Sequence, residues 1–266
     1  MMKLALSNSA SNNLALFNNL PSHFKTKLAE IWQNSYGELY EPVTDQATSL
    51  EDSLEEVLEL LQDNNKTLTH LRYVWMALIL AVLVQPTIKY YQPDHSIADE
   101  IIGKMALWLI KTIKATANND LIPSIKTVDF DINKVVSSIS VKTEKKLGSL
   151  QILYEALDVY LSAAKTLDEN QSLEALMDIL DGCLEGYALF GGSAGRRDLF
   201  NWWLLDVVPA SWSLQPPTSF CKVNNSPNTK IIVSRQKEIL DRLLSIITDE
   251  STFLTFYYDS RRFEAY

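Results

Sequence analysis

The segment from Tyr73 to Val84 constrains the fold more than any other stretch, because it is apolar without interruption. Arg72 bounds it on one side and Gln85-Pro86 on the other, which leaves about 12 residues where roughly 20 are needed to cross a bilayer. A helix that is apolar all round at this length is typical of the centre of a bundle or array. We therefore expect a buried central helix and no membrane span.

Apolar residues at helical spacing surround this segment. Leu199 to Val208 is nearly as apolar and predicts a second core helix. Leucine and isoleucine stripes predict further helices over residues 22–40, 49–62, from Ser96 to near Asn118, 150–164, from Ser172 onward and 234–248. The fold class that follows is all-α, either a multi-helix bundle or an irregular helical array. Only a weak sequence similarity between the segments that begin at Ser49 and Ser172 favours a repeat.

Two helix starts are marked by capping patterns. Ser49 is followed three residues later by Asp52, and Ser96 by Asp99, which is the spacing at which two side chains cap a helix reciprocally. Helix breaks are expected at Pro93 and over Pro209 to Thr229. Alternation of apolar and polar residues over 121–141 predicts one small β-hairpin or an irregular linker.

The domain organisation expected is simple. Residues 1–21 form a Ser/Asn-rich N-terminal segment that we expect to be flexible, and residues 22–266 form a single helical domain. A subdivision into 22–120 and 145–266 is the alternative. The N-terminal segment lacks the apolar run of a signal peptide, so a cytoplasmic protein is expected.

Charge and cysteine usage exclude some functions. The formal net charge of −9 disfavours nucleic acid and anionic membranes as partners, since both need clustered Lys and Arg. Cys183 and Cys221 are too few for a disulfide framework. Cys183 sits among apolar residues of a helical stretch, where a buried reduced thiol is expected. This cysteine usage fits a protein that resides in a reducing compartment.

The most motif-like segment is Gly191 to Asp198, which contains the string G-x-S-x-G. A hydrolase elbow needs a histidine after the serine, yet all three histidines precede Ser193, so no catalytic residue is assigned. Glycines leading into a helix N-terminus can bind an anion through backbone N–H groups. The residues of this candidate anion or ligand site are Gly192, Ser193, Gly195, Arg196, Arg197 and Trp202. The alternative is internal pairing of the arginines with Asp181, Glu185 or Asp198.

Metal and cofactor sites find little support. The best metal candidate is His95 with Asp99, but two ligands do not make a site and Asp99 is expected to cap a helix. No Glu-x-x-His pair is present to build a di-metal bundle centre. We expect no metal and no cofactor. The tryptophans fit the core better than a ligand pocket.

By elimination, the leading hypothesis is a non-enzymatic helical protein-interaction or regulatory protein. The alternative is a small-molecule or anion-binding protein, enzymes included, that uses the Gly191 to Arg197 turn. A weaker alternative is a membrane-associated protein that uses the Tyr73 to Val84 helix. The aromatic residues between Phe253 and Tyr266, with the apolar helices, predict a protein partner, the simplest being a second copy in a homodimer.

Overall fold

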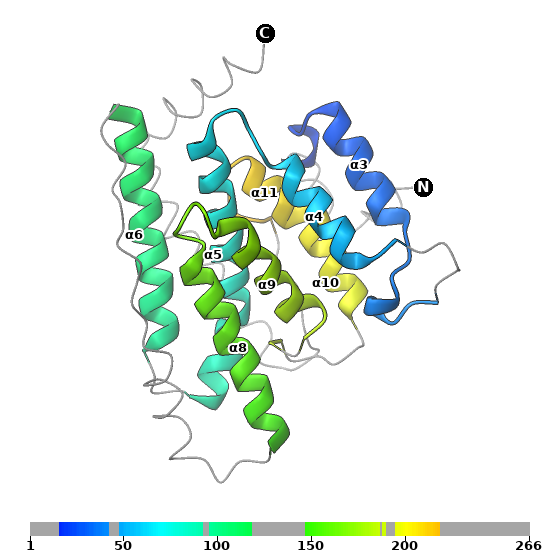
Figure 1. Cartoon of the computed structure of the whole chain (residues 1–266), viewed down its shortest axis with the longest axis vertical. Coiled ribbons are helices and arrows are strands. Elements are labelled where there is room, and N and C mark those ends of the chain that lie inside the picture. The colour runs from blue at the N-terminus through cyan, green and yellow to red at the C-terminus, as the bar shows by residue number, and fades with distance from the viewer. Residues whose placement is uncertain are drawn as a thin grey trace.

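The computed structural model describes residues 16–42, 48–92, 96–118, 147–186, 188–189 and 195–218, and every regular element in these ranges is helical (Figure 1). The all-α prediction is confirmed, with eight α-helices among the described residues. They are α3 (Ser22–Gln33), α4 (Leu50–Leu60), α5 (Lys66–Tyr91), α6 (Ile97–Asn118), α8 (Leu147–Lys165), α9 (Ser172–Leu184), α10 (Arg196–Trp202) and α11 (Val208–Trp212). A short 3₁₀ turn, η1 (Gly37–Leu39), and a π-helical turn, η2 (Trp203–Val207), complete the set.

Helix α5 is the centre of the fold. It packs against α6, α8, α9 and α11, and in Figure 1 it passes behind α8 and α9. Every residue from His70 to Val84 is buried. The expected central core helix is therefore confirmed. Because α5 is surrounded by helices from distant parts of the sequence, the arrangement is a bundle; in a solenoid each unit contacts only its neighbours.

Helix α5 is also longer than the sequence indicated. It continues through Pro86 to Tyr91, because Thr87, Ile88 and Tyr91 are buried on the core and their packing outweighs the backbone hydrogen bond that proline removes. At 26 residues it is the one described helix that is long and apolar enough to cross a membrane, and 89% of its most apolar window is buried inside the protein. Burial in the protein's own core accounts for that apolarity.

The break expected over Pro209 to Thr229 begins only at Ser213, because α11 ends at Trp212; residues 213–218 are not helical, and 219–229 lie outside the described residues. Helices α10 and α11 are joined through the π-helical turn η2, so helical backbone runs from Arg196 to Trp212. Pro209 is the second residue of α11 and follows the π-helical turn η2, where the regular α-helical hydrogen-bond pattern is interrupted. The prediction of a core helix over Leu199 to Val208 is confirmed, since only Asn201 and Leu205 in that stretch are not fully buried.

The capping predictions had mixed outcomes. The Ser49 hydroxyl accepts the backbone N–H of Asp52 at 3.0 Å and starts α4, as expected. At the start of α6, however, the Ser96 hydroxyl hydrogen-bonds to the Glu100 carboxylate. Asp99 instead accepts hydrogen bonds from Lys89 and Gln85 of α5. A contact between helices thus replaces the local one that the spacing predicted.

One core unites the described helices. It draws on α3 to α6 as well as α8 to α11, so residues 22–120 and the second half share their buried surface. Leu16, Phe17 and Leu20, from the segment expected to be flexible, also pack against it. Helix α3 ends at Gln33, short of the Tyr40 expected. The features predicted over 121–141, 234–248 and 253–266 lie outside the described residues.

Candidate functional site

The Gly191 to Arg197 turn is described from Gly195 onward. Gly195 precedes α10 with φ of 98°, a left-handed conformation that glycine adopts without strain. Gly192 and Ser193 lie outside the described residues, so their part in an anion site stays a prediction. Trp202 is 8% exposed and belongs to the core.

Arg196 is 5% exposed and reaches back to the end of α9. Its guanidinium donates to the carbonyl of Leu184 and, at 3.0 Å, to that of Gly186. Carbonyls at the end of a helix lack intrahelical partners and form its negative pole. Arg196 therefore caps α9 and ties it to the start of α10.

Arg197 connects the start of α10 to the end of α3. It donates to the backbone carbonyls of Trp32 and, at 2.8 Å, of Asn34. It also donates to the Glu41 carboxylate at 3.1 Å and to the side chain of Asn201 at 3.1 Å. This guanidinium joins the start of α10 to residues 32–41, which are far away in the sequence.

The structure thus pairs the two arginines differently from the expectation. Their hydrogen bonds go to helix-end carbonyls and Glu41, where the sequence suggested Asp181, Glu185 or Asp198. Carbonyl partners are set by the packing of helices and leave no mark in the sequence. An anion at this turn would compete with acceptors that both guanidinium groups already have.

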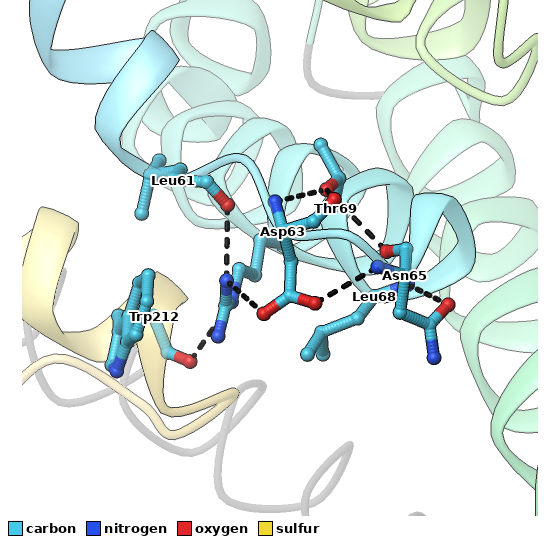
Figure 2. Close-up of polar contacts among 7 residues, drawn as sticks. Leu61, Asp63, Asn65, Leu68, Thr69 and Trp212 are labelled. Carbon is cyan, nitrogen blue, oxygen red and sulfur yellow. Dashed lines mark hydrogen bonds and ion pairs between the residues drawn. The ribbon is translucent and has the colours of Figure 1, made fainter. Parts of the chain in front are cut away.

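A third arginine, Arg72, forms a junction that sequence reasoning missed (Figure 2). Arg72 is 3% exposed, and it donates to the carbonyls of Leu61 at 3.0 Å and Trp212 at 3.2 Å. A carboxylate oxygen of Asp63 lies 3.6 Å away, and the guanidinium stacks 3.6 Å from the centroid of the Trp212 ring. Carbonyl, carboxylate and ring contacts together compensate the charge of this buried cation.

The same junction fixes the turn between α4 and α5. Asp63 accepts the backbone N–H of Asn65 at 2.9 Å and donates its own N–H to the Thr69 hydroxyl at 2.8 Å (Figure 2). The Asn65 side chain accepts the N–H of Leu68 and caps α5. The one signal available in the sequence was an arginine at the border of the longest apolar run.

Other side chains that often carry chemistry also join helices. A ring nitrogen of His70 lies 2.7 Å from the Thr166 carbonyl at the end of α8, and its ring packs 4.7 Å from that of Trp108 on α6. Burial lowers the pKa of His70, while the Thr166 carbonyl and nearby carboxylates raise it in part. The Tyr160 hydroxyl donates to the Ala81 carbonyl of α5 at 2.6 Å.

The cysteine prediction is confirmed for Cys183, which is free and buried. Burial raises the pKa of this thiol to about 12, so it is held as an inert thiol. Among the described residues, no group of three or more His, Cys, Asp or Glu side chains is placed to hold a metal ion. His95 lies outside those residues, and Asp99 is paired with Lys89 at 2.6 Å.

The outer surface differs from these buried contacts, because it gathers charged side chains of one sign. Helix α9 lies between α4 and α8, and the three cross the side of the molecule turned toward the viewer in Figure 1. We call a set of carboxylates on or beside these helices, which interact electrostatically with one another, the acidic face; it consists of Glu38, Glu51, Asp158, Asp178, Asp181 and Glu185. Four of the six are exposed and two are half-buried. The ion pairs formed among the described residues use other carboxylates: Glu30, Glu41, Glu56, Asp63 and Asp99.

Like charges interact across the acidic face. Burial raises the pKa of Glu185, and the charges of Asp181 and Glu38 raise it further. Burial likewise raises the pKa of Asp158, with Glu155 and Asp178 adding to the effect. Lys165 and Arg196 act in the opposite direction. The charged forms of Asp158 and Glu185 are therefore disfavoured by their surroundings.

Tyr40 stands at one edge of the acidic face. Its backbone is left-handed, with φ of 62°, and its side chain is 62% exposed. The preceding turn η1 places Glu38 where it accepts the N–H of Leu50 at the start of α4. The Arg196 guanidinium lies 5.2 Å from the Tyr40 ring centroid. A bulky residue in this conformation costs roughly 1–2 kcal/mol, and the strain is maintained here beside a charged surface.

Comparison with protein-family models, with curated proteins and with solved structures finds no match for this chain.

Proposed function

We propose that this chain is a non-enzymatic, cytoplasmic interaction protein that acts by binding a protein partner. One observation carries the proposal: the buried histidine, cysteine and arginines of the core make contacts between helices, whereas the most distinctive exposed feature is a charged surface. His70, Cys183 and Arg72 illustrate the first half of this contrast, since each is buried in the helical core. What the described part of the chain offers to another molecule is shape and charge, and binding needs only these.

The anion-binding alternative receives less support. Its two arginines donate to internal acceptors, and displacing them would open the caps of α9 and α3. Titration calorimetry with inorganic phosphate tests it directly. Saturable binding below about 1 mM that is lost in Arg197→Gln would favour the alternative over our proposal.

A homodimer remains part of the proposal, but fewer of the features that predicted it from the sequence still support it. Helix α5 and the Leu199 to Val208 segment bury their apolar surface within one chain, so they leave none to cover. The expectation of a homodimer therefore rests on the aromatic residues at the C-terminus, within 253–266. Light scattering at tens of micromolar should give twice the monomer mass of 30.1 kDa, and a chain lacking residues 253–266 should give the monomer mass. A monomeric full-length chain would contradict self-association.

The interaction function is tested by cross-linking in the native cell. A photoreactive amino acid is placed singly at Tyr40, Tyr90 and Leu107, which are large exposed side chains in separate elements. We expect at least one position to give a discrete adduct with one protein, and the complex to re-form from the two purified chains. If no position gives an adduct that can be reconstituted, the proposed function fails.

A further inference from the structure

Helix α3 lies at the margin of the helical body and is held on it by one apolar face. It packs mainly on α4 and η2, on the side of the molecule away from α6 (Figure 1). Its buried residues, Phe24, Leu28 and Ile31, are four and three residues apart, which places them on one side of the helix. The Phe24 ring meets the Trp212 ring of α11 edge-on, with 5.4 Å between the centroids. Amphipathic helices bind to other proteins with this spacing of apolar anchors.

The ends of α3 are not stabilised by its own side chains. Pro21 occupies the N-cap position without a side-chain hydrogen bond, the first turn has no acidic residue, and the last turn has no basic residue. At the C-terminal end, Arg197 of α10 donates to the backbone carbonyls of Trp32 and Asn34. A helix of 12 residues is marginal on its own in water. Docking on the body therefore keeps α3 helical.

The polar contacts that fix α3 are open to solvent. The Lys27 ammonium lies 2.5 Å from the Glu56 carboxylate of α4, and the two side chains are 33% and 42% exposed. Arg197 is partly exposed as well, whereas Arg72 at the central junction is buried. Exposed ion pairs contribute little to stability and are weakened by salt. The hold on α3 thus consists of three apolar side chains and contacts that water reaches.

The turn after α3 belongs to the same unit. Tyr36 is buried, and its hydroxyl donates to the Ile31 carbonyl at 3.0 Å and lies 3.1 Å from the Ser53 hydroxyl of α4. Tyr40 follows with its left-handed backbone, a strained conformation that persists only while the surrounding contacts fix it. Opening relieves this strain and so lowers the cost of detachment. We call residues 22–40 the α3 unit.

We propose that the α3 unit is a lid, and that the surface it covers on α4, η2 and α11 binds an amphipathic helix of the partner protein. This inference rests on the proposed interaction function and names the surface and the partner's element. Helix α3 itself defines the partner, because the surface already accepts a helix with apolar residues four and three residues apart. The two helices compete for one surface, so the apparent affinity for the partner is reduced to the fraction of chains in which the lid is open.

Hydrogen exchange of the unmodified chain tests whether the lid opens. Helix α9 is the control, because its 13 residues nearly match the length of α3 and it packs on α8, α5 and α4. We expect the amides of α3 to exchange at least a hundredfold faster than those of α9, after correction for sequence. Arg197→Gln should accelerate exchange in α3 further and leave α9 unchanged, because Arg197 holds the end of α3. Equal exchange of the two helices would overturn the lid.

A covalent lock tests the binding surface. The lid lock and the control lock each replace an ion pair between two helices by two cysteines: Lys27→Cys with Glu56→Cys, and Lys89→Cys with Asp99→Cys. Both chains also carry Cys221→Ser, so that a short bis-maleimide bridges the introduced thiols while Cys183 stays buried. Thermal unfolding checks that each bridged chain is folded.

Bridging the lid lock should weaken binding of the purified partner at least tenfold, whereas the bridged control lock should bind within threefold of the unmodified chain. A photoreactive residue at Trp212, which α3 covers through Phe24, should give an adduct with a partner segment whose apolar residues are four and three apart. Two bridged chains that bind the partner equally well would overturn this inference and leave the interaction function intact. An adduct at Trp212 with α3 of a second copy would overturn it too. Absence of any partner adduct at Tyr40, Tyr90 and Leu107 would overturn both.

Discussion

The Arg72 junction and the acidic face deal with charge in opposite ways. At the junction one buried cation is surrounded by two carbonyls, a carboxylate and an indole ring, so the charge of Arg72 is compensated within the fold. On the acidic face carboxylates stand beside other carboxylates and at the negative pole of α9. The difference shows that this fold compensates a buried charge fully, whereas it compensates the carboxylates of the acidic face only in part, through Arg196 and Lys165.

If the junction is structural, removing its cation should be severe. Arg72→Met leaves Asp63 and two buried carbonyls without their donor, and we expect a loss of about 3–5 kcal/mol in the free energy of unfolding. Urea denaturation followed by tryptophan fluorescence measures it. Arg72→Lys should recover part of the loss, since an ammonium still donates but cannot reach all three acceptors. A loss below 1 kcal/mol for Arg72→Met would show that the junction is dispensable.

A smaller loss is expected where a cation is only partly buried. Arg197 is 25% exposed, and Arg197→Met removes a donor from the end of α3 and from Glu41. We expect about 1.5–3 kcal/mol of destabilisation, the usual range for hydrogen bonds to charged groups. The same denaturation experiment applies. Arg197→Met that unfolds like the unmodified chain would show that α3 is held by its apolar contacts alone.

His70 predicts a dependence of stability on pH. Its pKa in the folded chain lies below the ordinary 6.5, because burial opposes the charged ring. The unfolded chain therefore binds the proton more readily, and stability is full above pH 6.5 and decreases as the pH falls toward the folded value. The slope contributed by one group cannot exceed about 1.4 kcal/mol per pH unit.

The raised pKa values of Asp158 and Glu185 act with the opposite sign, since these groups bind protons more readily in the folded chain. The effect of His70 is therefore isolated by comparison with His70→Gln, whose stability should vary less between pH 7 and pH 5. Parallel pH profiles for the two chains would refute the assignment.

The smallest effect is expected on the acidic face. Asp181→Asn with Glu185→Gln removes two charges from the negative pole of α9, and the chain should become more stable by a few tenths of a kcal/mol. The gain should shrink in 0.5 M salt, because screening weakens the repulsion. A loss of stability would mean that favourable interactions compensate the charges of these two carboxylates. The contrast with the Arg72 junction would then be wrong.

Sequence reasoning succeeded where the signal is local. Leucine spacing predicted α4, α8 and α9, and Ser49 marked the start of α4. It placed two helix ends too early, at Pro86 and just before Pro209, because burial of the following residues and a π-helical turn outweighed the local preference of proline. It also failed for partners of Arg72, Arg196 and Arg197, which are mostly backbone carbonyls brought together by packing. The acidic face required knowing that α4, α8 and α9 lie side by side.

Helix α5 has a consequence for the synthesis of the chain. Its apolar surface is covered by α8 and α9, yet the ribosome completes α5 at Tyr91 long before it reaches Leu184 at the end of α9. At about 5–20 residues per second, the nascent chain carries an uncovered apolar helix for roughly 5–20 seconds. Helix α6, which follows α5 directly in the chain and packs against it, is the first of the helices made after α5 that can cover part of its apolar surface.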